Sequence, residues 1–257
     1  CTDMLERLEF MTGQTKSTFS QLLKGFSRIT QIMGLVGILE REMLHFKISR
    51  MDELKNFLEG LLNSEFEDFY PLSGGASAEI YNIVLKNGKK LVLRRTPEKS
   101  ESRLAIPKKI EAKVQKIVKK NEIPVPEIIE EFDESSGVGS GYIMEFVLGE
   151  TIPRKILRDE RFAQIRPNLA LRIGEVLAKI HQTDLSEIKE LEKMTFYNSL
   201  NKLYEVYSSF NEPQPVFEYV FNYLAKVNIK EKNNVLIHGD YRLGNFIVSE
   251  NSIESII

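Results

Sequence analysis

The chain has 257 residues, of which 42% are hydrophobic and 28% charged, a composition typical of a globular protein with a sizeable core. Its formal net charge of −2 gives no reason to expect nucleic acid or an anionic membrane as a partner. The single cysteine, Cys1, excludes a disulfide framework within the chain and a zinc site built from cysteines. The apolar run at 32–39 is too short to cross a bilayer and too far along the chain for a secretory signal, so we expect a cytoplasmic protein.

The N-terminal region is predicted to be helical. Apolar residues recur every three or four positions over 17–48 and over 51–62, which predicts a helix in each range. Such stripes are typical of packing against a core, and the alternative is a helical module at 1–50 that binds a partner. We interpret residues 1–50 as a helical N-terminal extension, and the methionine at position 51 leaves open the alternatives that they are a fragment or lie upstream of the true start. The oligomeric state stays open.

The pattern then changes to that of strands. Short apolar runs at 69–73, 78–86 and 89–95 predict three strands, and Asn87-Gly88 between the last two predicts an antiparallel hairpin. This dipeptide favours a type I′ turn, in which both central residues have positive φ.

The middle of the chain continues with one helix and two strands. The stretch "IPKKIEAKVQKIVKK" (106–120) predicts a helix, whose many lysines we interpret as a solvated face. The runs "IIEEF" and "GYIMEFVLGE" (141–150) predict strands, and helices are predicted after them at 168–182, 194–209 and 215–227.

This order of elements predicts an α+β fold. A small antiparallel sheet with one inserted helix, a connector and a helical region suggest two lobes with a crevice between them. We place the N-terminal lobe at 51–145 and the C-terminal lobe at 146–257.

A glycine-rich turn, "SGGAS", lies between two of the predicted strands. Gly74 and Gly75 let backbone amides approach a ligand closely, and Ser77 adds a hydroxyl. The turn lacks the GKS ending and the following helix of a P-loop, and it does not match the dinucleotide fingerprint. Taken alone, a plain tight turn explains it equally well.

Two charged residues form a second candidate group. Arg94 lies in the strand "LVLRR" and Glu111 in the following helix. A strand cation held by a helix carboxylate is one way in which phosphoryl-transfer sites grip the phosphates of a nucleotide. The alternatives are two solvated surface charges, or Arg95 in place of Arg94. Strand alternation puts the two arginines on opposite faces of the sheet.

The stretch "LIHGDYRLGNFIV" (236–248) carries the strongest signal. Asp240 and Asn245 lie in a loop between two strand-like runs, and a carboxylate with a carboxamide can accept a hydroxyl proton and help to hold Mg²⁺. Such residues often serve turn chemistry instead. The His-Gly-Asp sequence, the spacing to Asn245 and the flanking runs together favour a catalytic loop.

These segments resemble the aminoglycoside phosphotransferase and choline kinase superfamily, the kinase-fold enzymes that phosphorylate small molecules. The matching segments occur in the family's order: "LSGGASAEIY", "LVLRR", Glu111, "YIMEFVLGE", "LAKIHQTD" and the loop at 236–248. The chain looks most similar to the kinase-like domains fused to acyl-CoA dehydrogenases. The resemblance covers about residues 51–257 and implies a two-lobed protein-kinase-like fold, with an antiparallel N-terminal lobe and a partial helical C-terminal lobe.

The resemblance also implies roles for individual residues. In the catalytic loop, Asp240 would be the catalytic base or would orient the acceptor hydroxyl, and Asn245 would be a magnesium ligand. His238 would brace this loop and His181 would be structural, each as a buried histidine.

The same resemblance implies a nucleotide site. Arg94 would contact the phosphates of ATP, with Glu111 as its ion-pair partner. The remaining contacts would come from the turn over the phosphates and from backbone groups that bind adenine, namely Gly74, Gly75, Ser77, Glu145 and Val147. The expected activity is an ATP- and magnesium-dependent transfer of the γ-phosphate to a hydroxyl of a small molecule. The alternative is a nucleotide-binding pseudokinase or scaffold without turnover.

One feature departs from the family. Its members place an aspartate for a second magnesium site after the strand that follows the loop, whereas this chain ends with "FIVSENSIESII". We therefore expect an incomplete fragment, inactive by itself, in which "NFIV" and "SIESII" are exposed apolar strands. The acceptor cannot be deduced from the sequence, and the likeness to the dehydrogenase-linked domains favours a hydroxylated metabolite or hydroxy acid.

Overall fold

The computed structural model describes residues 49–72, 78–97, 106–230 and 234–257. The helix predicted at 17–48 and the glycine turn with Gly74, Gly75 and Ser77 lie outside these ranges. The chain divides between Gly60 and Leu61 into two compact units, which are described separately. In the first unit the described backbone is helical, in a helix that runs over 49–62 and confirms the one predicted at 51–62.

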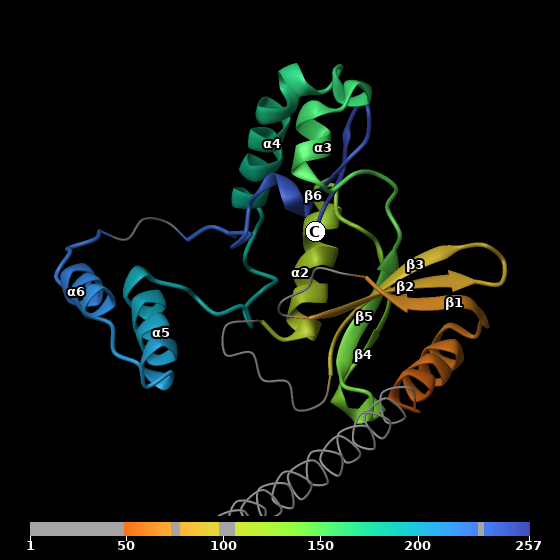
Figure 1. Ribbon diagram of the computed structural model, residues 1–257, viewed down its shortest axis with the longest axis horizontal. Coiled ribbons are helices and arrows are strands. Elements are labelled where there is room, and N and C mark those ends of the chain that lie inside the picture. The colour runs from red at the N-terminus through yellow and green to blue at the C-terminus, as the bar shows by residue number, and fades with distance from the viewer. Residues whose placement is uncertain (1–48, 73–77, 98–105, 231–233) are drawn as a thin grey trace, which may run out of the picture. The chain divides into compact units, whose positions relative to one another are not determined.

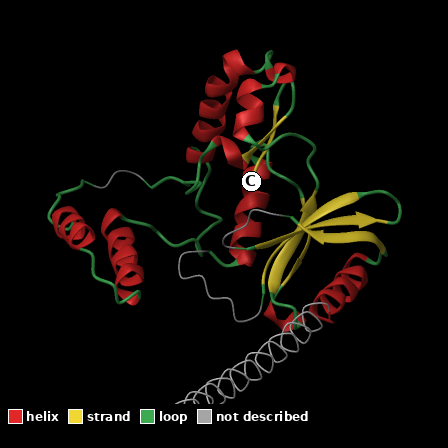
Figure 2. Ribbon diagram, in the orientation of Figure 1, coloured by secondary structure: helices red, strands yellow, loops and turns green. Residues whose placement is uncertain are grey.

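The second unit begins with a five-stranded sheet in which every neighbouring pair is antiparallel, in the order β1-β2-β3-β5-β4. Figure 2 shows these strands gathered together, and most helices of the unit follow them in the chain. The strands are β1 Phe66–Pro71, β2 Glu79–Leu85, β3 Lys90–Thr96, β4 Ile128–Phe132 and β5 Ser140–Glu145. The antiparallel sheet is confirmed, and β5 ends five residues earlier than predicted.

The hairpin between β2 and β3 is present, but its turn differs from the predicted one. Only Gly88 has a positive φ, of 81°, whereas Asn87 does not. Gly88 N donates to Leu85 O at 2.8 Å, and Leu85 N donates to Lys89 O at 2.9 Å. This is a three-residue loop with a glycine in the left-handed region, not a type I′ turn. The Asn87 side chain accepts a hydrogen bond from Lys89 N at 2.9 Å, which stabilises the turn without a positive φ at Asn87.

Helix α2 (Lys108–Lys120) connects the sheet with the rest of the unit. Near its start, Ala112 packs with Val92, Tyr142 and Met144 of the sheet. Near its end, Val118 belongs to a second core cluster that includes residues of the later helices. In Figure 1, α2 runs from the sheet toward α3 and α4. One helix therefore positions residues of the sheet relative to the C-terminal part of the chain.

The C-terminal part is mostly helical, as predicted. The predicted helices at 168–182, 194–209 and 215–227 correspond to α4 Arg166–His181, α5 Phe196–Ser209 and α6 Pro215–Leu224. Sequence analysis missed α3 (Pro153–Arg158), because its six residues are too few for a periodic signal. The available signal was its first residue, a proline, which is favoured at the start of helices. Within the described ranges, no helix has the length and apolar character needed to cross a membrane.

Strand β6 (Phe246–Val248) is buried and β7 (Ile253–Ile256) is buried at Ser255 and Ile256, so the predicted exposure is wrong for these residues, whereas Ile257 is 49% exposed. Phe246 and Val248 are 0% exposed and Ile256 is 3% exposed. The two strands pair antiparallel with each other and lie in the same core cluster as α3 and α4. In addition, Ile256 N donates to Pro124 O, just after α2, at 2.7 Å.

Candidate active site

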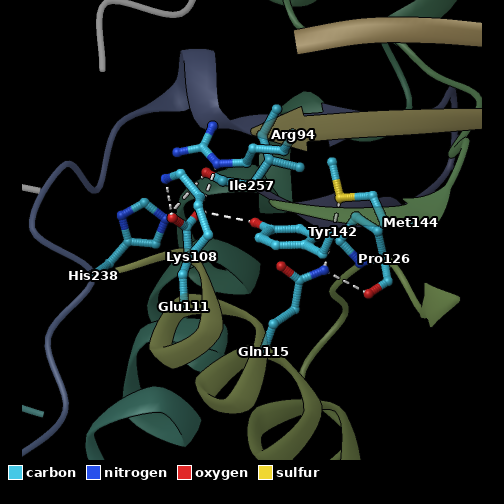
Figure 3. A network of polar contacts seen from close by, with 9 residues as sticks. All are labelled: Arg94, Lys108, Glu111, Gln115, Pro126, Tyr142, Met144, His238 and Ile257. Carbon is cyan, nitrogen blue, oxygen red and sulfur yellow. Dashed lines mark hydrogen bonds and ion pairs between the residues drawn. The ribbon is translucent and has the colours of Figure 1, made fainter. Parts of the chain in front are cut away.

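A cluster of polar side chains lies where β3 and β5 meet the first turn of α2 (Figure 3). Arg94 and Tyr142 are opposite each other in the β3–β5 pair, so their side chains share one face. Arg94 Nε donates to Glu111 Oε1 at 2.5 Å, and the Tyr142 hydroxyl donates to the same oxygen at 2.8 Å. Lys108 Nζ donates to Glu111 Oε2 at 2.5 Å. The predicted ion pair of Arg94 and Glu111 is therefore present, and the two residues are not isolated surface charges.

Arg95 lies on the opposite face of the sheet, as strand alternation predicts. Its Nε and Nη2 atoms donate to Glu79 Oε2 at 2.9 and 2.6 Å, and its Nη1 donates to Val138 O at 2.7 Å. The residue is only 8% exposed. Its donors are thus used within the fold, which leaves Arg94 as the cation on the face of α2.

The carboxyl group of Glu111 is held in its charged form. Burial raises its pKa, but the charges of Arg94 and Lys108, together with hydrogen bonds from Lys108 and Tyr142, outweigh this effect. The pKa of Glu111 therefore lies below its ordinary value of 4.5. The position of Glu111 in the first turn of α2 favours a negative charge as well.

We expect Glu111→Gln to remove a pH-dependent part of the stability. A carboxyl group with a lowered folded-state pKa stabilises the fold above its unfolded pKa of about 4.5, and this contribution is lost as the pH falls through the folded-state pKa. The melting temperature of the wild type should exceed that of the variant by a constant margin above about pH 6, and the margin should shrink below about pH 4.5. Thermal unfolding between about pH 3 and 7 measures it, with the exposed Glu250→Gln as control. A margin that does not change with pH would contradict the expectation.

Within the stretch 236–248, the loop lies between a non-strand segment and β6. The predicted strand-like run before the loop is wrong, because residues 234–238 form no strand within the described ranges, and only Leu236 is buried among them. The loop turns at Gly239, whose φ is 86°, a conformation that glycine adopts without strain. It ends in the short 3-10 turn Leu243–Asn245, directly before β6.

Asp240 and Asn245, the two residues of the predicted catalytic loop, contact each other. Asn245 Nδ2 donates to Asp240 O at 2.7 Å and to Asp240 Oδ2 at 2.9 Å. Arg242 Nε lies 3.0 Å from both carboxylate oxygens of Asp240. The hydrogen bonds from Asn245 and Arg242 hold the pKa of Asp240 below its ordinary value. The loop thus presents a charged, solvent-exposed carboxylate in a defined orientation.

The two predicted structural histidines differ. His238 braces the loop: its Nδ1 accepts from Asp240 N at 3.3 Å, and its Nε2 lies 3.2 Å from Ile257 O. It is half-buried, not buried as predicted. His181 is exposed, so its predicted burial is wrong. The buried face of α4 carries Ile180, and the next residue of a helix points about 100° away from it.

The loop and the polar cluster belong to one region of the structure. Ile257 N donates to Asn245 O at 2.9 Å, and Ile257 O contacts His238. Figure 3 draws His238 and Ile257 in the same network of polar contacts as Lys108 and Glu111. His238 of the loop therefore lies close to the cluster of Arg94, Lys108 and Glu111.

The connector after β5 leads away from the sheet. Glu145 N donates to Glu127 O at 2.9 Å, and Glu145 Oε1 accepts from Glu127 N at 2.9 Å. Val147 follows as a half-buried residue. The connector then joins β6, because Glu150 and Val248 exchange two backbone hydrogen bonds of 2.9 and 3.0 Å. The adenine contacts implied for Glu145 and Val147 remain a prediction.

Sequence analysis missed three residues of this region: Lys108, Tyr142 and Arg242. Lys108 was included in a solvated helix face, although it is 3% exposed. Its position three residues before Glu111 was the available signal, since such residues are neighbours on a helix. For Arg242 the signal was its place two residues after Asp240. The partner of Tyr142 depends on the pairing of β3 with β5, which no local pattern indicates.

The fold and this arrangement are those of a kinase-like fold: an antiparallel sheet carrying a cation–carboxylate pair, followed by a loop with a paired aspartate and asparagine. Residues 68–257 match the model of the phosphotransferase enzyme family. Because this match covers more than half of the chain, the protein belongs to that family.

Relatives and solved structures agree with this assignment. The chain is 25% identical over 210 residues to mouse (Mus musculus) acyl-CoA dehydrogenase family member 10, covering 76% of this chain and 19% of that protein. Its fold is similar to that of a protein named as an aminoglycoside phosphotransferase from Ralstonia eutropha, with a TM-score of 0.58, 20% identity, and coverage of 80% of this chain and 63% of that one. It is also similar to an amicoumacin kinase in complex with AMP-PNP and Ca²⁺, with a TM-score of 0.51, 16% identity, and coverage of 79% and 63%.

Proposed function

We propose that the protein transfers the γ-phosphate of ATP, with magnesium, to a hydroxyl group of a small molecule. The observation that carries this proposal is the pairing of Asp240 with Asn245 in a loop whose His238 lies in the same network of polar contacts as the Arg94–Glu111 ion pair. Phosphoryl transfer requires such a set of groups, because catalysis depends on positioning the acceptor and on stabilising charge around the transferred group.

The residues of the loop fit a magnesium ion. Asn245 uses its Nδ2 for Asp240, so its amide oxygen can act as a hard ligand, of the kind that Mg²⁺ prefers. When bound, this ion would neutralise negative charge on the phosphates. The presence of AMP-PNP and Ca²⁺ in the related amicoumacin kinase supports a nucleotide and a divalent cation here.

The residues of the sheet fit the nucleotide. Arg94 would donate to the phosphates while Glu111 holds its guanidinium through Nε. We assign the backbone of Glu145 and Val147 to adenine, and the turn with Gly74, Gly75 and Ser77 to the phosphates, as the family resemblance implies.

Asp240 would orient the acceptor hydroxyl and take up its proton. Because its pKa lies below the ordinary value, Asp240 is ionised at neutral pH but is a weak base. A weak base suits a reaction in which the proton leaves late, so orientation of the hydroxyl would be the larger contribution. Hydroxylated metabolites or hydroxy acids are our preferred acceptors, based on the relationship to the acyl-CoA dehydrogenase family member.

A second candidate is a nucleotide-binding module without turnover. It is favoured by one observation: both carboxylate oxygens of Asp240 accept hydrogen bonds, from Arg242 and Asn245. An assay of ATP consumption with a panel of hydroxylated metabolites distinguishes the two candidates. Both should bind ATP, but only the phosphotransferase should consume it.

The metal assignment is tested with Asn245→Ala. We expect the increase in ATP affinity that magnesium causes to fall about 10- to 100-fold, the scale of a disturbed metal site, while affinity measured in EDTA stays unchanged. Titration of the full-length protein with a fluorescent ATP analogue measures both values. The exposed Asn251→Ala is the matched control. Equal magnesium dependence in wild type and Asn245→Ala would remove Asn245 from the metal site.

A further inference from the structure

Lys108 is a buried cation at the start of α2. Its side chain is only 2% exposed, and burial of an ammonium group is costly unless it is paired. It also stands at the first residue of α2, where the helix dipole disfavours a positive charge. A lysine before a glutamate is, in addition, the weaker order for a helical ion pair. Helix stability therefore does not explain this residue.

The contact of Lys108 is specific. Its Nζ donates to Glu111 Oε2, while Arg94 Nε and the Tyr142 hydroxyl both donate to Oε1. Each oxygen of Glu111 thus has its own cation. Lys108 occupies the oxygen that Arg94 does not use.

Because Lys108 and Arg94 contact different oxygens of Glu111, Arg94 keeps donors available. Within the described part of the chain, its guanidinium donates only through Nε, so Nη1 and Nη2 can donate to an anion. An arginine and a carboxylate tend to form two parallel hydrogen bonds when both oxygens are accessible. Without Lys108, Glu111 could turn its second oxygen to an Nη atom and use a donor that a phosphate needs.

We propose that Lys108 is a positioning residue of the nucleotide site. It holds the second oxygen of Glu111 and so keeps the outer nitrogens of Arg94 available to the phosphates of the nucleotide. This inference rests on the proposed function, because it assumes that Arg94 binds these phosphates.

The test compares Lys108→Met with Lys109→Met in the full-length protein. Lys109 is the exposed neighbour on the same helical turn. Affinities for ATP, ADP and adenosine are measured by competition against a fluorescent ATP analogue at constant magnesium. We expect Lys108→Met to lower the affinities for ATP and ADP about tenfold, the effect of one lost charged hydrogen bond. The affinity for adenosine should stay unchanged. Lys109→Met should bind all three like the wild type.

A double-mutant cycle of Lys108→Met and Arg94→Ala measures the coupling between the two residues. Because Lys108 acts through Arg94, the effect of Lys108→Met on ATP affinity should largely disappear in the Arg94→Ala background. If Lys108→Met does not fold, Lys108→Gln keeps a hydrogen-bond donor without the charge and should weaken ATP several-fold. Lys108→Arg, which keeps the charge, should restore most of the affinity.

A purely structural role predicts a different result. Lys108→Met would then lower the melting temperature while ATP affinity stayed at the wild-type value, and this outcome overturns the inference alone. A wild-type protein that binds no ATP would overturn the proposed function and this inference with it. An equal loss of affinity for ATP and for adenosine would also overturn the inference about Lys108, because adenosine has no phosphates.

Discussion

Asp240→Asn should lower turnover by about 10²- to 10⁴-fold, the usual scale for a positioned acid–base group. The variant keeps the shape of the side chain but loses the negative charge that orients the acceptor hydroxyl and takes up its proton. ATP affinity should change little, since the exposed carboxylate of Asp240 contacts Arg242 and Asn245 and no residue of the sheet. Initial rates with ATP and an identified acceptor, together with ATP titrations of the full-length protein, measure both quantities.

The control for this substitution is Asp159→Asn, another exposed aspartate, which lies outside the loop. It should retain wild-type turnover. Near-normal turnover in Asp240→Asn would remove Asp240 from its catalytic role. ATP binding that persists in a wild type without turnover on any acceptor would favour the module without activity.

The second large effect is expected for Arg94→Ala, which should weaken ATP affinity about 10- to 100-fold. This range corresponds to the loss of about 1.5–3 kcal/mol from a charged hydrogen bond. Arg95→Ala should leave the ATP affinity of the folded protein near the wild-type value. Its main effect should be on stability, because it leaves the Glu79 carboxylate and Val138 O without their buried partner. Calorimetric ATP titrations and thermal unfolding of both variants separate the two effects.

Glu111 provides a further comparison. Glu111→Ala should lower ATP affinity by about as much as Arg94→Ala does. The loss of binding free energy in the double variant should be smaller than the sum of the losses in the two single variants. If Arg95→Ala weakens ATP more than Arg94→Ala, the phosphate-binding cation is on the other face of the sheet and our assignment is wrong.

Several features of the fold follow from local sequence patterns. The alternation of strand residues places Arg94 and Arg95 on opposite faces, and the structure confirms this. The helix that carries Glu111 was predicted from its apolar spacing. The loop with Asp240 and Asn245 was found from its residue types and their spacing, which bring the two side chains within 2.9 Å of each other.

The errors arose where a local pattern does not determine the neighbours of a residue. The apolar run that enters the loop was predicted as strand-like, but within the described part of the chain residues 234–238 form no strand. The apolar strands β6 and β7 were predicted to be exposed, yet they pair with each other and pack into the core. His181 was predicted to be buried, although the buried face of its helix lies one residue earlier.

The sequence by itself therefore determined the family, most of the strands and helices, the face on which Arg94 lies and the loop that carries Asp240 and Asn245. Periodicity and spacing carry this information, because they act within one element or one loop. Only the tertiary structure decided that Lys108 is buried against Glu111 and that Tyr142 shares the same carboxylate. These contacts depend on how β3, β5 and α2 pack together, and burial is a property of that packing.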